Sequence, residues 1–171
     1  MRKKVTIIVL LLAIIVASAV PSMVSAKNND KGSWIPKRYQ KYCQDIGYKF
    51  GVSPELIEAI IEHESSGQAK AYNSRYGCYG LMQINKSVHT DRMKKLGVTD
   101  LYNAKQNITV GADILLDLFE ECDGDIYWVL MRYHGERNAK AKAESGQYSY
   151  YAKSIVNRAY ELEEAHGKHN Y

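Results

Sequence analysis

The chain has 171 residues, of which 46% are hydrophobic and 25% charged, and only 3 are proline. This globular composition excludes a disordered, collagen-like or low-complexity chain, and the length predicts one domain with a single core. The formal charge is +4, but three of the 23 basic residues lie within the first four positions, which leaves 20 basic against 19 acidic residues elsewhere. This near-neutral balance gives no reason to expect nucleic-acid binding, which depends on clustered positive charge.

The N-terminus has the pattern of a secretory signal peptide. Basic residues at positions 2–4 precede an uncharged run of twelve residues, Val5 to Val16. This run is shorter than the roughly 20 apolar residues that cross a bilayer, but it suits a signal-peptide core. Small or short residues at 24–26 predict cleavage after Ala26, with 17–19 as a second candidate and an uncleaved membrane anchor as the alternative. We therefore expect a leader over 1–26, a flexible lead-in over 27–33 and one domain over 34–171 that works outside the cytoplasm, in the cell wall or at the cell surface.

The cysteines and histidines give no metal motif. An extracytoplasmic location permits a disulfide, but the three cysteines Cys43, Cys78 and Cys122 leave at least one thiol free or paired between chains. Their spacing does not choose among the three single bridges. No Cys-x-x-Cys or His-Glu-x-x-His motif occurs, and the five histidines are scattered, so we expect neither a metal nor a cofactor.

Helical periodicity dominates the rest of the chain. Pro36 can start a first helix that Gly51 ends, and Ser53-Pro54-Glu55 is a strong start signal for a second helix that runs to about Ser65. Further helices are expected over 107–121, from 125 onward and over 149–165. No strand with alternating polarity is apparent. The sequence therefore predicts a mostly α fold in one compact domain.

One acidic residue of the second predicted helix lies among apolar ones. At 100° per residue, Glu58 and Glu62 point away from the apolar stripe, as solvated acids would. Glu64 instead falls within the stripe that contains Ile57 and Ile60. Apolar surroundings favour the neutral form of a carboxyl group, which can then act as a general acid. The alternative is a glutamate that bends out to water or braces a loop amide.

The residues after Glu64 resemble the lysozyme-like lytic transglycosylases of the soluble, or SLT, type. The resemblance is carried by Glu64-Ser65, Asn73-Ser74, the Gly80–Gln83 run Gly-Leu-Met-Gln, Asn107-Ile108 with Gly111, and Arg132-Tyr133-His134-Gly135 in the place of an Ala-Tyr-Asn motif. It covers about Pro36 to Leu162. The chain departs from the family pattern in having His134 for Asn, Cys78 for Ala, and a loop before Gly80 that matches the family's serine at either Asn73 or Ser74.

This resemblance implies a lysozyme-like fold, a peptidoglycan substrate and a catalytic Glu64. Glu64 would protonate the glycosidic oxygen between MurNAc and GlcNAc and then take the proton of the muramyl C6 hydroxyl, which closes a 1,6-anhydro ring. The implied substrate-binding residues are Ser65, Ser74, Met82, Gln83, Tyr133 and His134. Among them, Tyr133 would hydrogen-bond Glu64, Gln83 would contact a sugar group and Met82 would line a subsite. Core packing for Met82 and Tyr133, a loop-bracing amide for Gln83 and a helix-bracing role for Ser65 are the alternatives.

The motif segment has no second acid, since no Asp or Glu occurs from Ser65 to Thr90. Ordinary glycosidases use two carboxyl groups, whereas the implied ring closure needs one. Asp100 or Glu136 could supply a second one from farther along the chain, so a hydrolytic muramidase remains an alternative, as does a catalytically silent wall-binding or assembly module. The expected partner is the peptidoglycan glycan strand, and the expected state is a monomer. The domain could serve wall remodelling or open the wall for a secretion, conjugation or phage machine.

Overall fold

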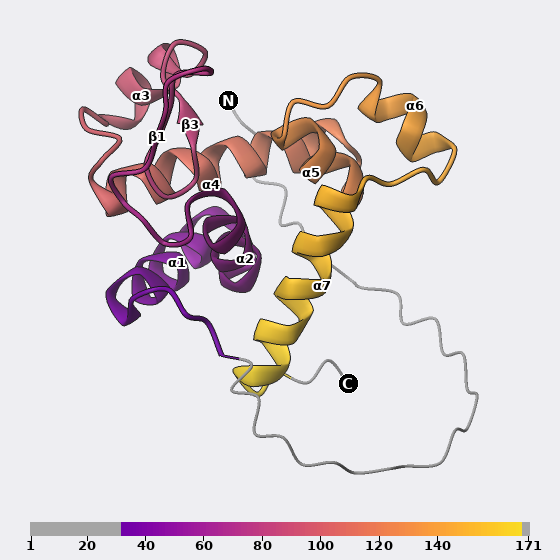
Figure 1. Ribbon diagram of the computed structural model, residues 1–171, viewed down its shortest axis with the longest axis horizontal. Coiled ribbons are helices and arrows are strands. Elements are labelled where there is room, and N and C mark those ends of the chain that lie inside the picture. The colour runs from indigo at the N-terminus through magenta and orange to yellow at the C-terminus, as the bar shows by residue number, and fades with distance from the viewer. Residues whose placement is uncertain (1–31, 169–171) are drawn as a thin grey trace.

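Capping residues mark the ends of the first two helices, as the sequence predicts. In the computed structural model, which describes residues 32–168, α1 spans Lys37–Phe50 and ends at Gly51 in the left-handed conformation (Figure 1). α2 spans Pro54–Ser65, and the Ser53 hydroxyl accepts a hydrogen bond from the backbone N–H of Leu56. Both predicted helices are confirmed. The predicted leader over 1–26 lies outside the described residues, and none of the described helices is long and apolar enough to cross a membrane.

Side-chain caps also mark the starts of the three longest later helices. α4 (Ala104–Glu121) starts three residues earlier than expected because the side chain of Asn103 caps it. Asp125 caps α5 (Ile126–Tyr133), and Ser149 caps α7 (Tyr150–Ala165), so these two predicted helices are confirmed. The sequence did not predict α3 (Thr90–Leu96) or α6 (Ala139–Glu144), which have only 7 and 6 residues. The mostly α fold is confirmed.

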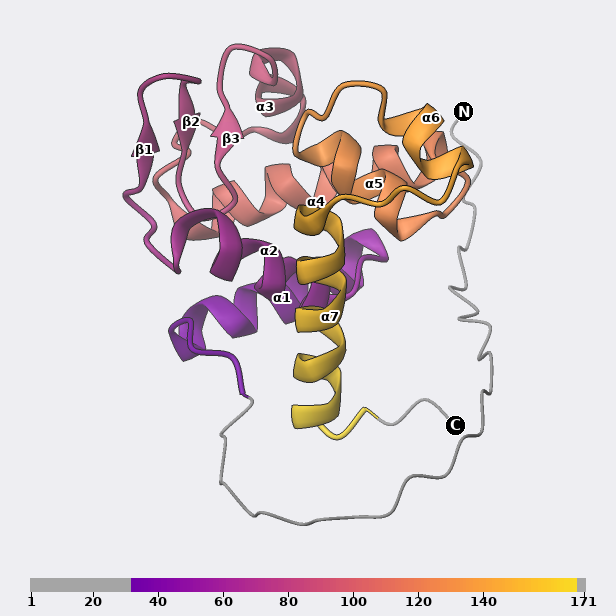
Figure 2. The same cartoon turned by 45° about the vertical axis from the view of Figure 1, so that its right-hand side comes forward.

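A small sheet lies beside the helices. Its antiparallel strands β1 (Tyr72–Asn73), β2 (Cys78–Tyr79) and β3 (Ile84–Asn85) are adjacent in chain order and lie next to α3 (Figure 2). The sequence did not predict these strands. Strands of two residues are too short for an alternating pattern to appear in the sequence.

Helix α2 lies between α1, α4 and α7 and is buried on nearly every side. Glu58 and Glu62 are 2% and 6% exposed, so the prediction that they are solvated was wrong. A helical wheel treats one helix alone, and the face of α2 that it assigned to water is covered here by α7 and the N-terminal segment. Burial raises the pKa of Glu58, whose Oε2 is buried without a hydrogen-bond partner among the described residues.

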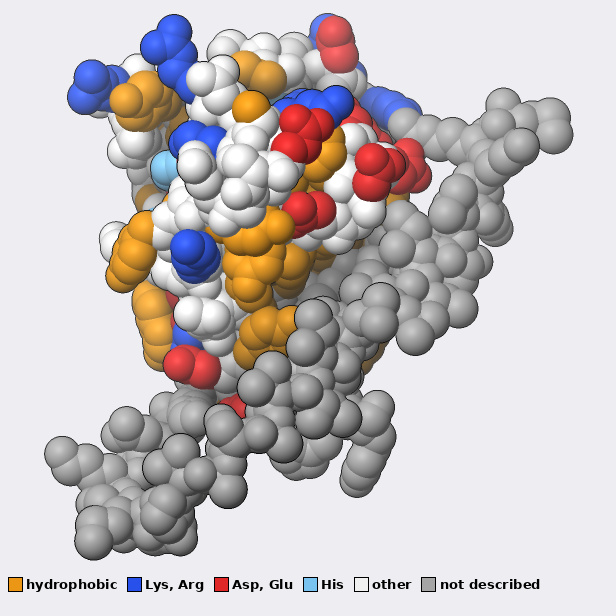
Figure 3. All heavy atoms as spheres, turned by 90° about the vertical axis from the view of Figure 1, so that its right-hand side faces the viewer, with side chains coloured by type: hydrophobic (Ala, Val, Ile, Leu, Met, Phe, Trp, Pro, Cys, Tyr) orange, Lys and Arg blue, Asp and Glu red, His pale blue; other side chains and the backbone are white. Residues whose placement is uncertain are grey.

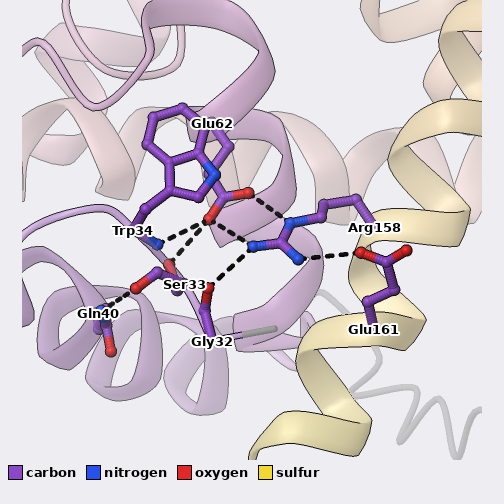
Figure 4. Close-up of polar contacts among 7 residues, drawn as sticks. All are labelled: Gly32, Ser33, Trp34, Gln40, Glu62, Arg158 and Glu161. Carbon is purple, nitrogen blue, oxygen red and sulfur yellow. Dashed lines mark hydrogen bonds and ion pairs between the residues drawn. The ribbon is translucent and has the colours of Figure 1, made fainter. Parts of the chain in front are cut away.

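Glu62 joins the start of the described chain to α7 (Figure 4). One carboxylate oxygen accepts from the Arg158 Nε at 2.6 Å, and the other accepts from the hydroxyl of Ser33 at 3.1 Å and the backbone N–H of Trp34 at 3.2 Å. Arg158 also donates to the carbonyl of Gly32 at 3.1 Å. The last two residues of the predicted flexible lead-in are thus held against the domain.

The described residues contain no disulfide. All three cysteines are free thiols; Cys43 and Cys122 are buried, and Cys78 is partly exposed. On the face shown in Figure 3, basic and acidic side chains lie among one another with hydrophobic side chains between them.

Removal of Arg158 should destabilise the fold because Glu62 stays buried without its cation. Loss of one partner of a buried ion pair costs 3–5 kcal/mol. Since the Arg158 side chain is 23% exposed, we expect the free energy of unfolding of Arg158→Ala to fall by about 2–3 kcal/mol. Urea unfolding followed by circular dichroism measures this loss.

Lys41→Ala is the matched control, since Lys41 and Asp45 form an exposed pair with side chains 69% and 53% exposed. Its effect should stay below about 1 kcal/mol. Equal losses in the two variants would show that the Arg158 contact contributes no more than a surface ion pair.

Candidate active site

The end of α2 presents Glu64 to the start of α7. Ser66 ends the helix in the left-handed conformation, and Glu64 occupies its last turn, partly exposed. The Tyr151 hydroxyl donates a hydrogen bond to Glu64 Oε1 at 2.6 Å. The carboxyl group therefore lies at the junction of two helices with one oxygen already engaged.

Aromatic contacts fix Tyr151. The His134 ring stacks on it at 4.0 Å with an interplanar angle of 19°, and the His63 ring meets its edge at 4.9 Å. Burial and the negative charge of Glu64 raise the pKa of Tyr151 far above its usual value. The hydroxyl therefore stays protonated and remains a donor to Glu64.

The predicted hydrogen bond from Tyr133 to Glu64 was wrong. The Tyr133 hydroxyl donates to the backbone carbonyl of Met82 at 2.8 Å. Burial raises the pKa of Tyr133, with smaller contributions from the nearby Glu64 and Cys78. Tyr133 thus belongs to the surroundings of Glu64, but the direct partner of Glu64 is Tyr151, near the start of α7, which the sequence did not single out.

The Asn107 side chain holds the Gly-Leu-Met-Gln segment in place. It is fully buried, accepts from the backbone N–H of Met82 at 2.8 Å, and donates to the carbonyls of Tyr79 at 2.8 Å and Leu101 at 2.9 Å. Gly80 has a φ of 73°, and a Cβ there would clash with Asn107 and the Leu101 carbonyl. A side chain at position 80 would therefore displace the Asn107 amide that holds this segment.

Met82 is a core residue in this structure. Its side chain is 0% exposed and packs so closely on Gly111 that a Cβ on the glycine would overlap its sulfur. The expectation that this side chain lines a sugar subsite is therefore corrected, because the side chain has no surface to offer. Its backbone carbonyl, however, orients Tyr133.

The other predicted residues differ in burial and in their contacts. Ser65 is buried and its hydroxyl donates to the Ile61 carbonyl at 3.2 Å, which makes it a helix-bracing residue. Gln83 is partly exposed and donates through Nε2 to the Gly80 carbonyl at 3.0 Å. Ser74 and His134 are exposed.

Neither candidate for a second acid is a free carboxylate facing Glu64. Asp100 lines a separate pocket beside α1 and accepts from the backbone N–H of Tyr102. Glu136 pairs with Lys142 at 2.9 Å. Burial favours the neutral form of Glu136, but hydrogen bonds with Ser149 and Lys142 outweigh it and lower the pKa. Among residues 32–168, no group of three or more His, Cys, Asp or Glu side chains could hold a metal ion.

The fold and this glutamate–tyrosine site define a lysozyme-like helical domain. The pattern of the Transglycosylase SLT domain matches residues 41–156, and the chain belongs to that family. Among solved structures, the chain is similar to an inactive Glu-to-Gln mutant of the lytic transglycosylase Slt from Pseudomonas aeruginosa, with a TM-score of 0.66. That likeness covers 80% of this chain and 25% of the other at 16% identity, so it concerns the fold alone.

Curated relatives are longer than this chain. It is 34% identical over 104 residues to a transglycosylase of Enterobacteria phage PRD1, with coverage of 58% of this chain and 37% of the phage protein. It is 36% identical over 89 residues to endo-type membrane-bound lytic murein transglycosylase A of Klebsiella pneumoniae, with coverage of 48% and 41%. It is 29% identical over 112 residues to lysozyme g of Epinephelus coioides, with coverage of 58% and 53%. The chain thus spans between about a third and a half of these proteins.

Tyr151→Phe should impair cleavage of purified cell walls while preserving the fold. The ring and its contacts with His134 and His63 remain, but the hydrogen bond to Glu64 is lost. A hydrogen bond to a charged group is worth about 1.5–3 kcal/mol, so we expect kcat to fall by about 10- to 100-fold. Tyr150→Phe, at a neighbouring position that is 85% exposed, is the control and should cleave like the wild type. An unchanged kcat in Tyr151→Phe would remove this hydrogen bond from the catalytic machinery.

Alkylation of Cys78 should block the site. Burial and the charge of Glu64 raise the pKa of this thiol, so its reaction with iodoacetamide should accelerate as the pH rises above the usual thiol range. Peptide mapping should find the label on Cys78 before the buried Cys43 and Cys122, and wall cleavage should fall by at least about tenfold. Cys78→Ala should cleave walls and resist the reagent. Full activity of a protein completely labelled at Cys78 would place the thiol outside the substrate path.

Proposed function

We propose that this domain is a peptidoglycan lytic transglycosylase that cleaves the β-1,4 bond between MurNAc and GlcNAc and leaves 1,6-anhydromuramyl ends. The observation that carries this proposal is the partly exposed Glu64 carboxyl group, held by the Tyr151 hydroxyl within a Transglycosylase SLT domain. A relative named as a lytic murein transglycosylase supports the same chemistry.

In the first step, the Glu64 carboxylic acid donates its proton to the glycosidic oxygen, and the bond from that oxygen to C1 of the muramyl sugar breaks. The substrate's own N-acetyl group stabilises the positive charge that develops at C1. Since Tyr151 engages Oε1, the other carboxyl oxygen, Oε2, is the one that exchanges the proton. Because one oxygen holds the hydrogen bond while the other exchanges the proton, the carboxyl group keeps its orientation during the reaction.

In the second step, Glu64 is a carboxylate and takes the proton of the muramyl C6 hydroxyl. The C6 oxygen then bonds to C1 and closes the 1,6-anhydro ring. Glu64 regains its proton and no water is consumed. Because Tyr151 stays protonated, it donates to Glu64 in both charge states, and the charged state gains more from that hydrogen bond.

The substrate would lie against the exposed surfaces around Glu64. We assign sugar contacts to Ser74, to the outer face of the His134 ring and to the amide oxygen of Gln83, whose nitrogen is already engaged. Tyr133 and Ser65 act as positioning residues, through Met82 and the helix end respectively.

A hydrolytic muramidase is the second candidate, because the chain resembles lysozyme g and because Glu136 lies close enough to influence Tyr151 electrostatically. The ion pair of Glu136 with Lys142 weighs against it, since a base must be free to activate water.

The predicted leader supports work outside the cytoplasm, at the cell wall or cell surface. We further propose a monomer that acts on glycan strands in wall remodelling or in the local opening of the wall for secretion, conjugation or phage machinery. The similarity to a phage transglycosylase is consistent with the last role.

Glu64→Gln tests the mechanism, because glutamine keeps an oxygen for Tyr151 but cannot donate a carboxylic proton. We expect wall cleavage to fall by at least about 10²-fold with unchanged thermal unfolding. Mass spectrometry of the wild-type digest should show muramyl products lighter by one water than hydrolytic products. Glu120→Gln, at an exposed position of α4, is the control and should cleave normally.

Each contrary outcome selects an alternative. Products that carry the added water would identify a muramidase. Equal activity in Glu64→Gln and wild type would remove Glu64 from the reaction, and negligible activity in both would favour a silent wall-binding module.

A further inference from the structure

We infer that a pocket on the other side of the small β-sheet from Glu64 binds the carboxylate-bearing peptide stem of peptidoglycan. The pocket lies between the start of α1, the loop after α2 and the start of α4. Its lining includes Arg38, Tyr39, Lys70, Asp100, Tyr102 and Lys105. This inference rests on the proposed function only for the identity of the ligand.

Three basic side chains line the pocket without a carboxylate partner among the described residues. Arg38, Lys70 and Lys105 are exposed and form no ion pair within residues 32–168. Tyrosine rings hold two of them instead: the Arg38 guanidinium lies 4.8 Å from the Tyr39 ring centroid, and Lys70 Nζ lies 5.0 Å from that of Tyr102. Because a tyrosine ring carries no net charge, it does not neutralise the cation, which can still bind an anion.

The loop that supplies Asp100 and Tyr102 to the pocket is held by hydrogen bonds. The Gln106 side-chain oxygen accepts from the backbone N–H groups of Thr99 at 2.8 Å and Asp100 at 2.9 Å. The Asp100 carboxylate in turn accepts from the N–H of Tyr102 at 2.8 Å. The loop before α4 is therefore fixed by hydrogen bonds, and a ligand would not have to order it.

The pocket faces away from the catalytic site. Successive side chains of a strand point to opposite sides, and in β2 Cys78 lies near Glu64 while the Tyr79 ring contacts that of Tyr102 at 5.5 Å. None of the lining residues contributes to the Glu64 site. A ligand in this pocket is therefore separate from the sugars at the cleaved bond.

The size and charge of the pocket suit a peptide end. Its volume of about 380 Å³ is at the small end of the usual range for ligand pockets, roughly 300–1,000 Å³. Three cations against one carboxylate favour a ligand that carries more acidic than basic groups. The stem peptide of peptidoglycan offers carboxylates for Arg38 and the lysines, and an amino group for Asp100, whereas a neutral glycan offers neither.

The test uses the full chain with Glu64→Gln, so that binding is measured without cleavage. Free stem tetrapeptide is titrated and followed by NMR. We expect amide shifts at Tyr102 to Lys105 rather than at Cys78, and weaker binding as salt screens the exposed charges. Adding Arg38→Gln and Lys105→Gln should raise the Kd at least about fivefold, whereas Lys49→Gln with Lys95→Gln, exposed and outside the pocket, should leave it unchanged.

Two further ligands make the result decisive. A tetrapeptide with amidated carboxyl groups should bind at least about fivefold more weakly, and polyglycerol phosphate tests phosphate as the source of the anion. The inference is overturned if the tetrapeptide does not bind, if the pocket variants bind it as well as the parent does, or if only the phosphate polymer binds. Failure of the proposed function is recognised separately, as absence of wall cleavage by the wild type.

Discussion

The contact between α2 and α7 is the constraint on which the site depends, because polar pairs join the two segments at three places. At one end, Glu55 contacts His166 at 2.9 Å and Lys168 at 2.8 Å; farther along, Glu62 binds Arg158 at 2.6 Å; at the other end Glu64 accepts from Tyr151. Buried ion pairs contribute little net stability, but their geometry fixes how two helices align. That alignment brings the Tyr151 hydroxyl within hydrogen-bond distance of the Glu64 carboxyl group.

The family motif has a steric explanation in this chain. Gly80 and Gly111 are places where a side chain would collide with Asn107 and Met82 respectively. The asparagine satisfies three backbone groups that would otherwise be buried without partners, and it thereby fixes the turn that orients Tyr133. Much of the motif thus shapes the backbone beside Glu64, and its side chains need not touch a substrate to be required.

Local signals in the sequence predicted most of the helices, whereas the errors at the site are non-local. Caps such as Ser53 and Asp125 act within one helical turn, so the local sequence was enough to predict these helix starts. The burial of Glu62 and the partner of Glu64 depend on residues 96 and 87 positions away, and no periodicity within α2 encodes them. The assignment of Tyr133 as the partner of Glu64 was an error of this kind, because Tyr151 reaches Glu64 only through the packing of α7 against α2.

The absence of acids from Ser65 to Thr90 has consequences on both sides of the small β-sheet. On the side of Glu64 it leaves that residue without a second carboxylate from the motif segment, which suits the proposed ring closure better than a reaction that activates water. On the other side it leaves Lys70 without a local counter-ion, facing Tyr102 and the cations of α1 and α4. The same lack of acids therefore leaves the pocket around Lys70 with a positive electrostatic potential. Because successive residues of β2 point to opposite faces, Cys78 and Tyr79 contribute to the two sides separately.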